Sequence, residues 1–326
     1  MSVYIAGTGS YLPERILNNA DLEKMVDTSD EWIRVRTGIE ERHIAARDES
    51  TSDMARVAAE RALESAGITA ADLSAIVVAT STADYTFPNT ACLLQHSLGC
   101  KNILCYDLCA ACSGLIYALE TASSLIRANK KYRYVLVVGA EKLSGIVNWS
   151  DRNTCVLFGD GAGAFVLENR DGDDKFPVSS LGADGNYSQT LILPAGGSRN
   201  PASHETVDAG LHYIHMAGKE TFKLAIKAMV ESSNQVLTDS GVSPEDVALV
   251  IPHQANRRII QAVAQRLAVP PDRVFDNVNR YGNTSASSIG IAFDDAVRSG
   301  RLKRGDLVLL TAFGSGLTWG AMLIRY

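Results

Sequence analysis

Cys112 is the residue whose type and setting most favour chemistry. It stands in Tyr106-Asp-Leu-Cys-Ala-Ala-Cys-Ser-Gly-Leu-Ile-Tyr-Ala-Leu119, where an apolar strand ends near Leu108 and a helical run begins around Ser113. The small residues between them predict a tight turn, which places Cys112 at a helix N-terminus. Free backbone amides and the positive end of the helix dipole stabilise a thiolate there, and a thiolate attacks carbonyl carbon. A small buried thiol at a helix–sheet junction explains the position equally well, because free cysteines are often buried.

Two other segments carry polar side chains that suit catalysis. His253, in Pro252-His-Gln-Ala-Asn256, directly follows a strand, and α/β proteins gather ligand sites at the carboxyl edge of their sheets. Asn283, in Tyr281-Gly-Asn-Thr-Ser-Ala-Ser287, lies in a loop of small residues before a helix predicted over 288–297. Taken singly, His253 is better explained as a hydrogen-bonded structural histidine and Asn283 as a turn residue or helix cap. With Cys112 they form a stronger joint hypothesis of one site.

These residues must be positioned by alternating strands and helices. Apolar residues at helical spacing predict a helix over 52–63, and continuous apolar runs predict buried strands at 75–79, 134–138, 248–251 and 307–311. Gly67 and Gly241 follow helical runs at matching places, and the strands at 134–138 and 307–311 have nearly the same separation as these glycines. The chain is therefore predicted to contain two similar halves. The pattern favours an α/β fold with mixed sheets covered by helices.

Two stretches interrupt this pattern. The polar residues 169–175 predict a boundary, which divides the chain into a half over 1–172 that carries Cys112 and a half over 173–326 that carries His253 and Asn283. Residues 182–211 are rich in Gly, Ser, Asn and Pro and predict an irregular surface excursion. Loops of that length are usually functional or mobile.

Composition excludes several classes of protein. With 326 residues, of which 46% are hydrophobic and 21% charged, the chain is globular and forms one large or two fused domains. A formal charge of −6 provides no global field for nucleic acid or an anionic membrane, so neither is an expected partner. The N-terminal sequence has no signal-peptide pattern and charges interrupt every apolar run, so a cytoplasmic location is expected.

The cysteines and glycines do not favour a metal or a cofactor. Six cysteines are too sparse for a disulfide scaffold and are expected as reduced thiols. Cys109 and Cys112 are spaced as C-x2-C, but no second Cys or His pair follows at zinc spacing, and a redox pair is the weaker alternative. Gly159-Asp-Gly-Ala-Gly163 lacks the dinucleotide-binding spacing and precedes a strand-like run, so its glycines predict close packing.

The motifs around Cys112, His253 and Asn283, in that order with Phe158-Gly-Asp-Gly-Ala-Gly-Ala164 between, closely resemble those of β-ketoacyl-acyl-carrier-protein synthase III. The resemblance extends from Tyr4-Ile-Ala-Gly-Thr-Gly-Ser-Tyr-Leu-Pro13 to the terminal Thr318-Trp-Gly-Ala-Met-Leu-Ile-Arg-Tyr326. It implies a thiolase fold, in which two similar halves form five layers α-β-α-β-α, usually as a homodimer.

The resemblance also implies a decarboxylative condensation that starts fatty-acid synthesis. Cys112 takes an acyl group from acyl-CoA, and malonyl-acyl carrier protein then loses carbon dioxide and attacks the acyl-enzyme. His253 and Asn283 are implied donors to the malonyl thioester oxygen, and the backbone amides of Cys112 and Ser315 an oxyanion hole. Acyl-CoA is a substrate, so no cofactor is implied. Many relatives carry Gly where this chain has Ser315, and little loss is expected because the amide acts there.

Further positions are implied to bind substrate. Trp32 and Arg152 match residues that flank the adenine of coenzyme A, Arg36 lies near its phosphates, and Asn256 matches another coenzyme contact. An indole and a guanidinium can enclose a purine, and arginine pairs with phosphate. A surface tryptophan with solvated charges is the structural alternative. Lys219 replaces the Asn of some relatives at a pantetheine contact.

Phe87 matches a residue that crosses the dimer interface and closes the acyl pocket, which favours a short primer such as acetyl-CoA. Arg258, with Arg257 beside it and Lys223 near in sequence, is expected to dock the acidic carrier protein, since local field rather than net charge steers docking. Solvated charges on a helix face are the alternative explanation for Arg257 and Lys223.

Other activities remain as alternatives. The nearest is a related condensing enzyme or acyltransferase of a specialised pathway, and a less favoured one is an acyl-CoA hydrolase, because Cys, His and Asn in this order also suit hydrolysis. A biosynthetic thiolase is disfavoured, since no cysteine lies near the carboxyl end. A non-enzymatic binding protein is disfavoured because Cys112, His253 and Asn283 are all present.

Overall fold

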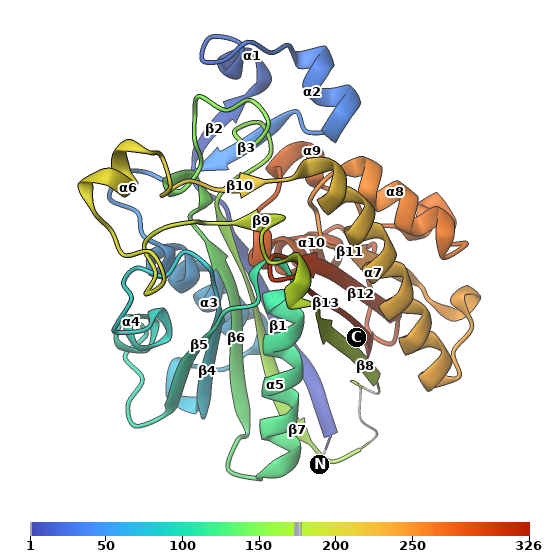
Figure 1. Cartoon of the computed structure of the whole chain (residues 1–326). Helices are drawn as coiled ribbons and strands as arrows, with labels where there is room; N and C mark the ends of the chain where they lie inside the picture. Colours follow the sequence, from blue (N-terminus) through green and yellow to red (C-terminus); the bar gives the residue numbers. More distant parts are fainter. Residues whose placement is uncertain (1, 173–175, 177) are drawn as a thin grey trace.

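Two mixed β-sheets organise the chain in the computed structural model, which describes residues 2–172, 176 and 178–326 (Figure 1). The first sheet has the order β1-β7-β6-β4-β5. Its strands are β1 (Ser2–Tyr11), β7 (Gly161–Arg170), β6 (Tyr134–Glu141), β4 (Ala75–Ala79) and β5 (Leu104–Leu108). The second sheet has the order β11-β12-β13-β8. Its strands are β11 (Leu249–Pro252), β12 (Leu307–Gly314), β13 (Thr318–Arg325) and β8 (Val178–Ala183).

The two sheets share one topology. In the first, β4 pairs parallel with β6, β6 antiparallel with β7, and β7 antiparallel with β1. In the second, β11, β12, β13 and β8 repeat these relations in the same order. Only the first sheet continues, because β5 adds parallel to the outside of β4. Each sheet takes its strands from one side of the predicted boundary between 172 and 173, and residue 173 lies outside the described residues.

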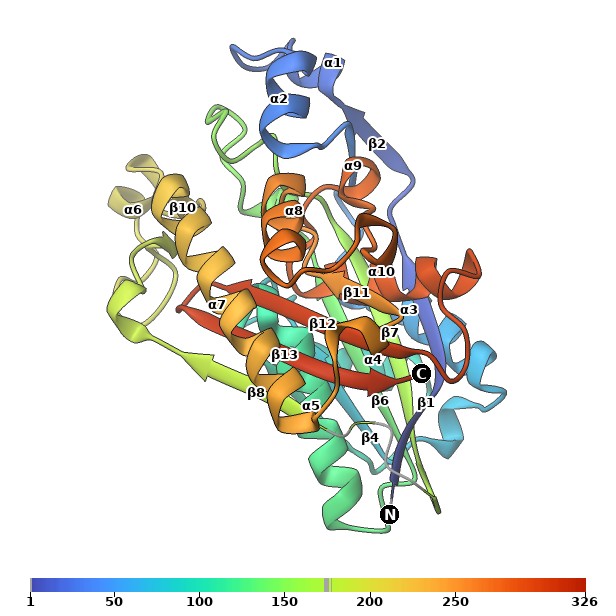
Figure 2. The same ribbon diagram turned by 90° about the vertical axis from the view of Figure 1, so that its right-hand side faces the viewer.

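Helices separate and cover the sheets, which gives five layers (Figure 2). The central layer contains α5 (Gly114–Ala128) and α10 (Ser288–Arg298), which share one buried core with the inner faces of both sheets. The helices α3 (Thr51–Ala66) and α4 (Thr90–Ser97) cover the outer face of the first sheet, and α7 (Gly218–Ser240) and α8 (Arg257–Arg266) that of the second. The α-β-α-β-α arrangement implied by the resemblance is therefore present.

Alternation along the strands explains this layering. Successive side chains of a strand point to opposite faces, so a fully apolar strand needs cover on both. On β4, Val77 packs in the central core and its neighbours Ile76 and Val78 pack under α3 and α4. On β12, Leu310 packs centrally and Leu309 packs under α7 and α8. The continuous apolar runs predicted as buried strands are thus each covered twice.

The repeated unit begins with a helix that ends at a glycine. The side chain of Ser50 caps α3 and forms a capping box with Asp53, and α3 ends at Gly67 with φ of 67°. The longer α7 ends in the same way at Gly241, with φ of 66°. Glycine adopts this left-handed conformation without a steric penalty. After each glycine the chain makes one short 3-10 turn and enters β4 or β11.

The remaining elements lie mainly around the upper end of the molecule in Figure 1. Two small sheets pair β2 (Arg15–Asn18) with β3 (Glu41–Ile44) and β9 (Leu191–Ile192) with β10 (His215–Met216). The short helices are α1 (Asn19–Leu22), α2 (Asp30–Thr37), α6 (His204–Asp208) and α9 (Val278–Tyr281). The 3-10 turns are η1 (Ala70–Asp72), η2 (Ala111–Ser113), η3 (Leu143–Gly145), η4 (Gly185–Tyr187), η5 (Pro244–Asp246), η6 (Pro271–Arg273) and η7 (Ser285–Ser287). The stretch 182–211, predicted as irregular, contains η4, β9 and α6.

Among the described residues, no helix has the length and apolar character needed to cross a membrane.

Candidate active site

Three polar residues predicted from separate motifs line one cavity. Cys112 comes from η2, His253 follows β11, and Asn283 lies between α9 and η7. The cavity has a volume of about 670 Å³, including the part open to solvent, and its other walls are mainly apolar side chains of α7, α8 and the loops around Phe158. The structure therefore brings together a thiol, an imidazole and a carboxamide from both halves of the chain.

Cys112 sits in a sharply bent turn between β5 and α5. Ala111 has φ of 47°, a left-handed value unusual for a residue with a side chain. The equivalent turn before α10 has Ser285 at φ of 50°, and the two residues have the same separation in sequence as Gly67 and Gly241. The duplicated halves thus use the same bend twice. In the first half it presents Cys112, and in the second it presents Ala286.

Burial opposes the ionised sulfur that the sequence predicted. The side chain of Cys112 is only 8% exposed, and burial raises the pKa of its thiol to about 12. The negative charge of Glu141 raises this pKa further, whereas the backbone N–H of Cys112 acts to lower it. The helix that follows is also one short turn away, because Cys112 lies in η2 and α5 starts at Gly114. The thiol is therefore neutral near pH 7, and its proton must leave as the sulfur attacks.

His253 is buried and neutral. It is 3% exposed, and burial lowers the pKa of its imidazole to about 3. Its Nδ1 lies 2.6 Å from the hydroxyl of Ser288, which also accepts the backbone N–H of Gln254 at 3.4 Å. We assign the hydroxyl proton of Ser288 to the bond with Nδ1, which leaves the single proton of the neutral ring on Nε2. In that tautomer His253 offers an N–H donor to a ligand.

Asn283, like His253, is fixed by hydrogen bonds that leave a donor group for the cavity. Its backbone accepts from Gly159 and donates to Leu157, so the loop is anchored to the segment before β7. Its side-chain oxygen accepts the backbone N–H of Ser285 at 2.8 Å. The turn role considered from sequence is thus real, but it uses only the oxygen of the carboxamide. The NH₂ group is left as a donor for the cavity.

Ser315 does not line the first cavity, but it shares a second one with Cys112. This cavity of about 1030 Å³, again including its open part, is also lined by Gly316 and Thr318. The hydroxyl of Ser315 donates to the carbonyl of Leu191, so the side chain is tied to β9. The hydroxyl of Thr318 donates to the carbonyl of Ala110 at 2.9 Å and links β13 to the turn that carries Cys112.

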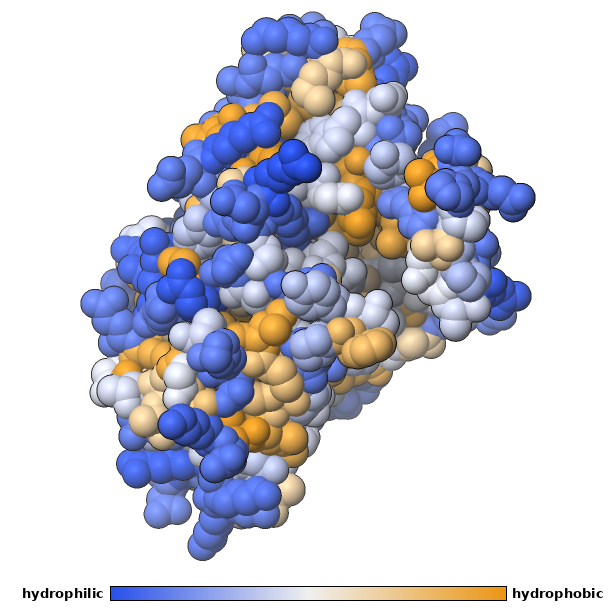
Figure 3. All heavy atoms as spheres, turned by 90° about the vertical axis from the view of Figure 1, so that its left-hand side faces the viewer, coloured by the Kyte–Doolittle hydropathy of each residue, from blue (hydrophilic) through white to orange (hydrophobic). Residues whose placement is uncertain are grey.

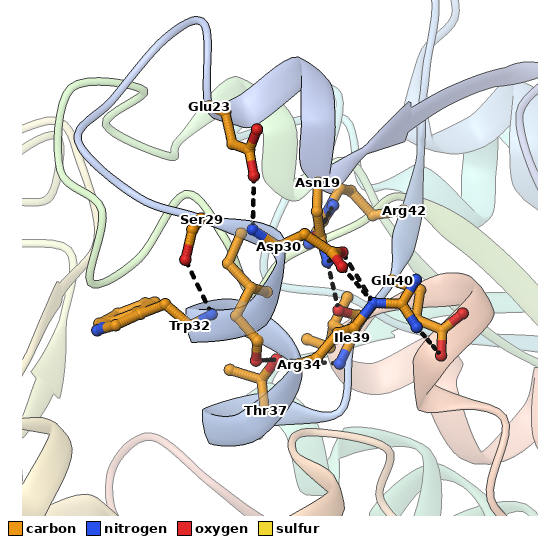
Figure 4. Close-up of polar contacts among 11 residues, drawn as sticks. Asn19, Glu23, Ser29, Asp30, Trp32, Arg34, Thr37, Ile39, Glu40 and Arg42 are labelled. Carbon is orange, nitrogen blue, oxygen red and sulfur yellow. Dashed lines mark hydrogen bonds and ion pairs between the residues drawn. The ribbon is translucent and has the colours of Figure 1, made fainter.

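Trp32 and two arginines form a stack at the upper end of the molecule. The guanidinium carbon of Arg36 lies 4.6 Å and that of Arg152 5.2 Å from the centre of the Trp32 ring system. The hydroxyl of Ser29 caps α2 at the backbone N–H of Trp32, and Asp30 accepts from Arg34. Figure 4 shows the indole pointing away from these polar contacts.

Asn256 connects this stack to the first cavity. Its side-chain oxygen caps α8 at the N–H of Arg258, and its side-chain nitrogen donates to the carbonyl of Arg36 at 3.1 Å. Asn256 also lines the cavity that contains Cys112 and His253. A single residue therefore joins α8, α2 and the cavity wall.

The other predicted residues are on the surface. Phe87 is 84% exposed. Arg258 and Lys223 are exposed, and the guanidinium of Arg258 lies 5.4 Å from the Phe222 ring centre. Arg257 is half-buried and forms an ion pair with Asp276 at 2.7 Å. The three basic residues thus differ, because only Arg257 has a carboxylate partner among the ion pairs of the described chain.

Sequence reasoning missed three residues that contact the site. Ser288 touches His253, and Glu141 accepts the hydroxyl of Ser285 at 3.1 Å close to Cys112. The serines lie within or next to the motif that contains Asn283, but no spacing rule indicates which backbone or side chain they reach. Glu141 ends β6, a strand paired in parallel with β4, and an acidic residue at the carboxyl edge of such a strand is a signal that was available.

Comparisons with known proteins agree over the whole chain. Residues 106–185 match the family model described as 3-Oxoacyl-[acyl-carrier-protein (ACP)] synthase III, and residues 237–326 match the model of its C-terminal part. The beta-ketoacyl-[acyl-carrier-protein] synthase III of Caldanaerobacter subterraneus subsp. tengcongensis is 54% identical over 322 residues, which are 99% of this chain and 97% of the relative.

Solved structures are equally similar. The crystal structure of 3-oxoacyl-[acyl-carrier-protein] synthase III from Aquifex aeolicus VF5 has a TM-score of 0.92 and 49% identity and covers 100% of both chains. The corresponding protein of Pseudomonas aeruginosa PAO1 has a TM-score of 0.92 and 40% identity, with 100% of this chain and 98% of that one covered. The predicted α/β fold is therefore confirmed.

Proposed function

The chain belongs to the 3-oxoacyl-[acyl-carrier-protein] synthase III family of condensing acyltransferases, and we propose that it joins an acyl-CoA primer to malonyl-acyl carrier protein at the start of fatty-acid synthesis. The products are 3-oxoacyl-acyl carrier protein, CoA and carbon dioxide. The observation that carries this proposal is the cavity in which the buried thiol of Cys112 meets His253 and Asn283. Both of the latter have their acceptor atoms engaged, so they offer donors.

In the first half-reaction Cys112 is the nucleophile. Its sulfur forms a bond to the acyl carbonyl carbon, the carbon–sulfur bond to CoA breaks, and the proton of the thiol leaves on CoA. The tetrahedral intermediate carries a negative oxygen that needs donors. We assign this role to the backbone amides of Cys112 and Ser315, because the two residues line the same cavity.

In the second half-reaction His253 and Asn283 stabilise the charge of decarboxylation. When malonate loses carbon dioxide, electron density moves onto the thioester oxygen. An Nε2–H of His253 and an NH₂ of Asn283 can both donate to that oxygen. Burial keeps His253 neutral by lowering its pKa to about 3, so it donates a hydrogen bond without first taking a proton. The carbanion then attacks the acyl group on Cys112 and displaces the Cys112 thiolate, which takes a proton from solvent and becomes the neutral thiol again.

The CoA part of the primer is proposed to bind along α2. Adenine would stack on the indole of Trp32, with Arg36 near the phosphates. The guanidinium of Arg152 lies 5.2 Å from the indole centre, so it must move outward to enclose the purine between itself and Trp32. Cation–π contacts of this kind contribute about 0.5–2 kcal/mol each. Asn256, which bridges α2 and the cavity, is placed to contact the pantetheine arm that must lead from the stack to Cys112.

A second copy of the chain is the proposed partner at the apolar side of the first sheet. β5 is an edge strand, and Leu104 on it is 39% exposed, while Tyr85 and Phe87 before α4 are 62% and 84% exposed. Figure 3 shows apolar surface gathered on the side of the molecule that carries α4. In a homodimer Phe87 would enter the partner's acyl pocket and favour a short primer. Exposed edges and large apolar side chains are usually covered in this way.

The carrier protein is proposed to dock on the basic residues of α7 and α8. Arg258 and Lys223 are exposed, and Arg258 lies over Phe222, which lines the cavity of Cys112. Arg257 contributes less free charge, because Asp276 pairs with it. All of these partners are water-soluble, and on that ground we propose a cytoplasmic location.

Separate assays of the two half-reactions test this function. A panel of acyl-CoA donors is incubated with the protein, Cys112 acylation is measured by intact mass, and malonyl-acyl carrier protein is then added to detect 3-oxoacyl product. His253→Ala and Asn283→Ala should lower condensation by about 100-fold while sparing acylation. His204→Ala, a change of an exposed histidine on α6, is the matched control. Equal loss of both half-reactions contradicts the assignment, and acyl-CoA hydrolysis without condensation supports a hydrolase.

A further inference from the structure

A buried carboxylate lies behind the nucleophile and has no part in the mechanism above. Glu141, the last residue of β6, is fully buried, and each donor recorded for it among the described residues is neutral. The backbone N–H of Ser81 donates to both of its oxygens at 3.1 Å, and the hydroxyl of Thr82 donates to Oε2 at 2.6 Å. A buried charge without a cationic partner is costly to maintain. Groups of this kind cluster at functional sites, where burial is used to tune their pKa.

Ser285 connects Glu141 to Cys112. Its hydroxyl donates to Oε1 of Glu141 at 3.1 Å, and Ser285 lines one cavity together with Cys112, because η7 packs against η2. Ser285 is 4% exposed and is held in place by the side-chain oxygen of Asn283, which accepts its backbone N–H. Because the hydroxyl has one proton and two lone pairs, it can donate to the carboxylate and accept from the thiol at the same time.

We propose that Glu141 is the proton acceptor for Cys112, acting through the hydroxyl of Ser285. As the sulfur attacks the acyl carbonyl, the thiol proton moves to the oxygen of Ser285 and the hydroxyl proton of Ser285 moves to Oε1 of Glu141. When the bond to CoA breaks, the same two transfers run in reverse and deliver the proton to the departing thiolate. One thiol is consumed and one formed, and Glu141 ends the half-reaction ionised as it began.

The electrostatic surroundings of Glu141 agree with reversible protonation of its carboxylate. Burial raises the pKa of Glu141 to about 7, which makes it a base that is half ionised near pH 7 and takes up a proton easily. The titratable group that faces it from η2 is Cys112. Directly after β6, Lys142 turns its ammonium to the carbonyls of Ala46 and Glu49.

Two further titratable groups lie near. The thiol of Cys109 contacts the hydroxyl of Ser81 at 3.8 Å. Before β7, the carboxylate of Asp160 accepts the backbone N–H groups of Ala45 and Ser144. Each of these groups has its own partner, so Cys112 is the acidic group that Ser285 connects to Glu141.

Alkylation of Cys112 by iodoacetamide between pH 5.5 and 9 tests this proposal. The rate is followed by peptide mass spectrometry, which separates Cys112 from the exposed Cys92 and Cys109. The wild-type rate should rise with an inflection near pH 7. Glu141→Gln should lose this inflection and react about tenfold more slowly at pH 8, because the acceptor is gone. Asp160→Asn removes another buried carboxylate and should keep the wild-type profile.

Ser285→Ala provides an independent test if Glu141→Gln does not fold. Ser285→Ala should show the same slow alkylation without an inflection near pH 7. The double variant Glu141→Gln/Ser285→Ala should be no slower than either single variant, because both substitutions interrupt the same proton path. A wild-type profile without an inflection near pH 7 overturns the proposal. So does a faster reaction in Glu141→Gln, which would mean that the carboxylate only repels the thiolate. The proposal rests on the proposed function, in which Cys112 is acylated by acyl-CoA. The alkylation assay contains no acyl-CoA, so it can fail or succeed independently of acyl loading.

Discussion

Gly314 faces the nucleophile turn with no room for a side chain, and substituting it with alanine tests whether this close packing positions Cys112. Gly314 ends β12, and a Cβ added there would lie 2.7 Å from the backbone nitrogen of Cys112 and 3.0 Å from the carbonyl oxygen of Ala110. The backbone of Gly314 is not in the left-handed region, so alanine meets no conformational penalty of its own. The substitution therefore acts through space alone.

The size of the effect follows from these distances. Ordinary contacts begin at 3.4 Å, so the turn must withdraw by about 0.7 Å to accept the methyl group. The turn is tied to β13 by Thr318, which opposes such a shift. Overpacking of this kind costs about 1–3 kcal/mol of unfolding free energy. A displacement approaching 1 Å at the reacting atom lowers the rate by about 10- to 100-fold.

Two measurements separate these effects. Single-turnover acylation by acetyl-CoA reports the position of the sulfur, and thermal unfolding reports the cost of the added methyl group. Gly314→Ala should acylate about 10- to 100-fold more slowly and unfold at a lower temperature. Gly185→Ala is the matched control, because no atom lies within 4 Å of the added Cβ. Wild-type acylation in Gly314→Ala would refute the idea that this contact sets the position of Cys112.

Three further predictions concern the imidazole and the coenzyme. Because the pKa of His253 is about 3 in the folded protein and 6.5 is its ordinary value, only the unfolded chain takes up a proton between these values. Wild type should therefore lose stability relative to His253→Gln as the pH falls from 6.5, by up to about 1.4 kcal/mol per pH unit in urea unfolding, and equal pH dependence contradicts this. Ser288→Ala frees Nδ1 and should lower condensation about tenfold with acylation retained, and a parallel loss of both refutes a role in orienting the ring. Trp32→Ala should raise the KM for acyl-CoA about tenfold at unchanged kcat, whereas Glu31→Ala should not, and unchanged affinity removes the indole from the proposed site.

The carboxylate of Glu141 changes how the nucleophile is understood. From sequence, the helix that follows Cys112 was expected to keep the sulfur ionised. In the structure, burial raises the pKa of the thiol to about 12. The relay through Ser285 resolves this difference, because a neutral thiol needs a base only at the moment of attack.

Much of the fold could be predicted because its signals are local. Gly67 and Gly241 end helices whatever their surroundings, since the left-handed conformation there disfavours other residues. Continuous apolar runs predicted strands covered on both faces, and β6 and β12 are buried along their whole lengths. Their matching separations revealed the duplication before any sheet order was known.

The sequence also identified the three candidate site residues and the kind of element end on which each one lies. Cys112, His253 and Asn283 each stood in a motif at the end of a predicted element, and one cavity contains all three. The resemblance, rather than spacing, supplied the expected role of each. The comparisons settle the family, and the roles themselves are for the half-reaction assays to test.

Only the tertiary structure decided which groups meet. Glu141 and Ser285 are 144 residues apart, and their hydrogen bond exists because η7 of the second half packs against the end of β6 in the first half. No periodicity or propensity encodes such a pair, since it depends on how the two sheets pack. Protonation follows the same rule: sequence determines that residue 112 is a thiol and residue 253 an imidazole, and burial by distant segments determines that both are neutral.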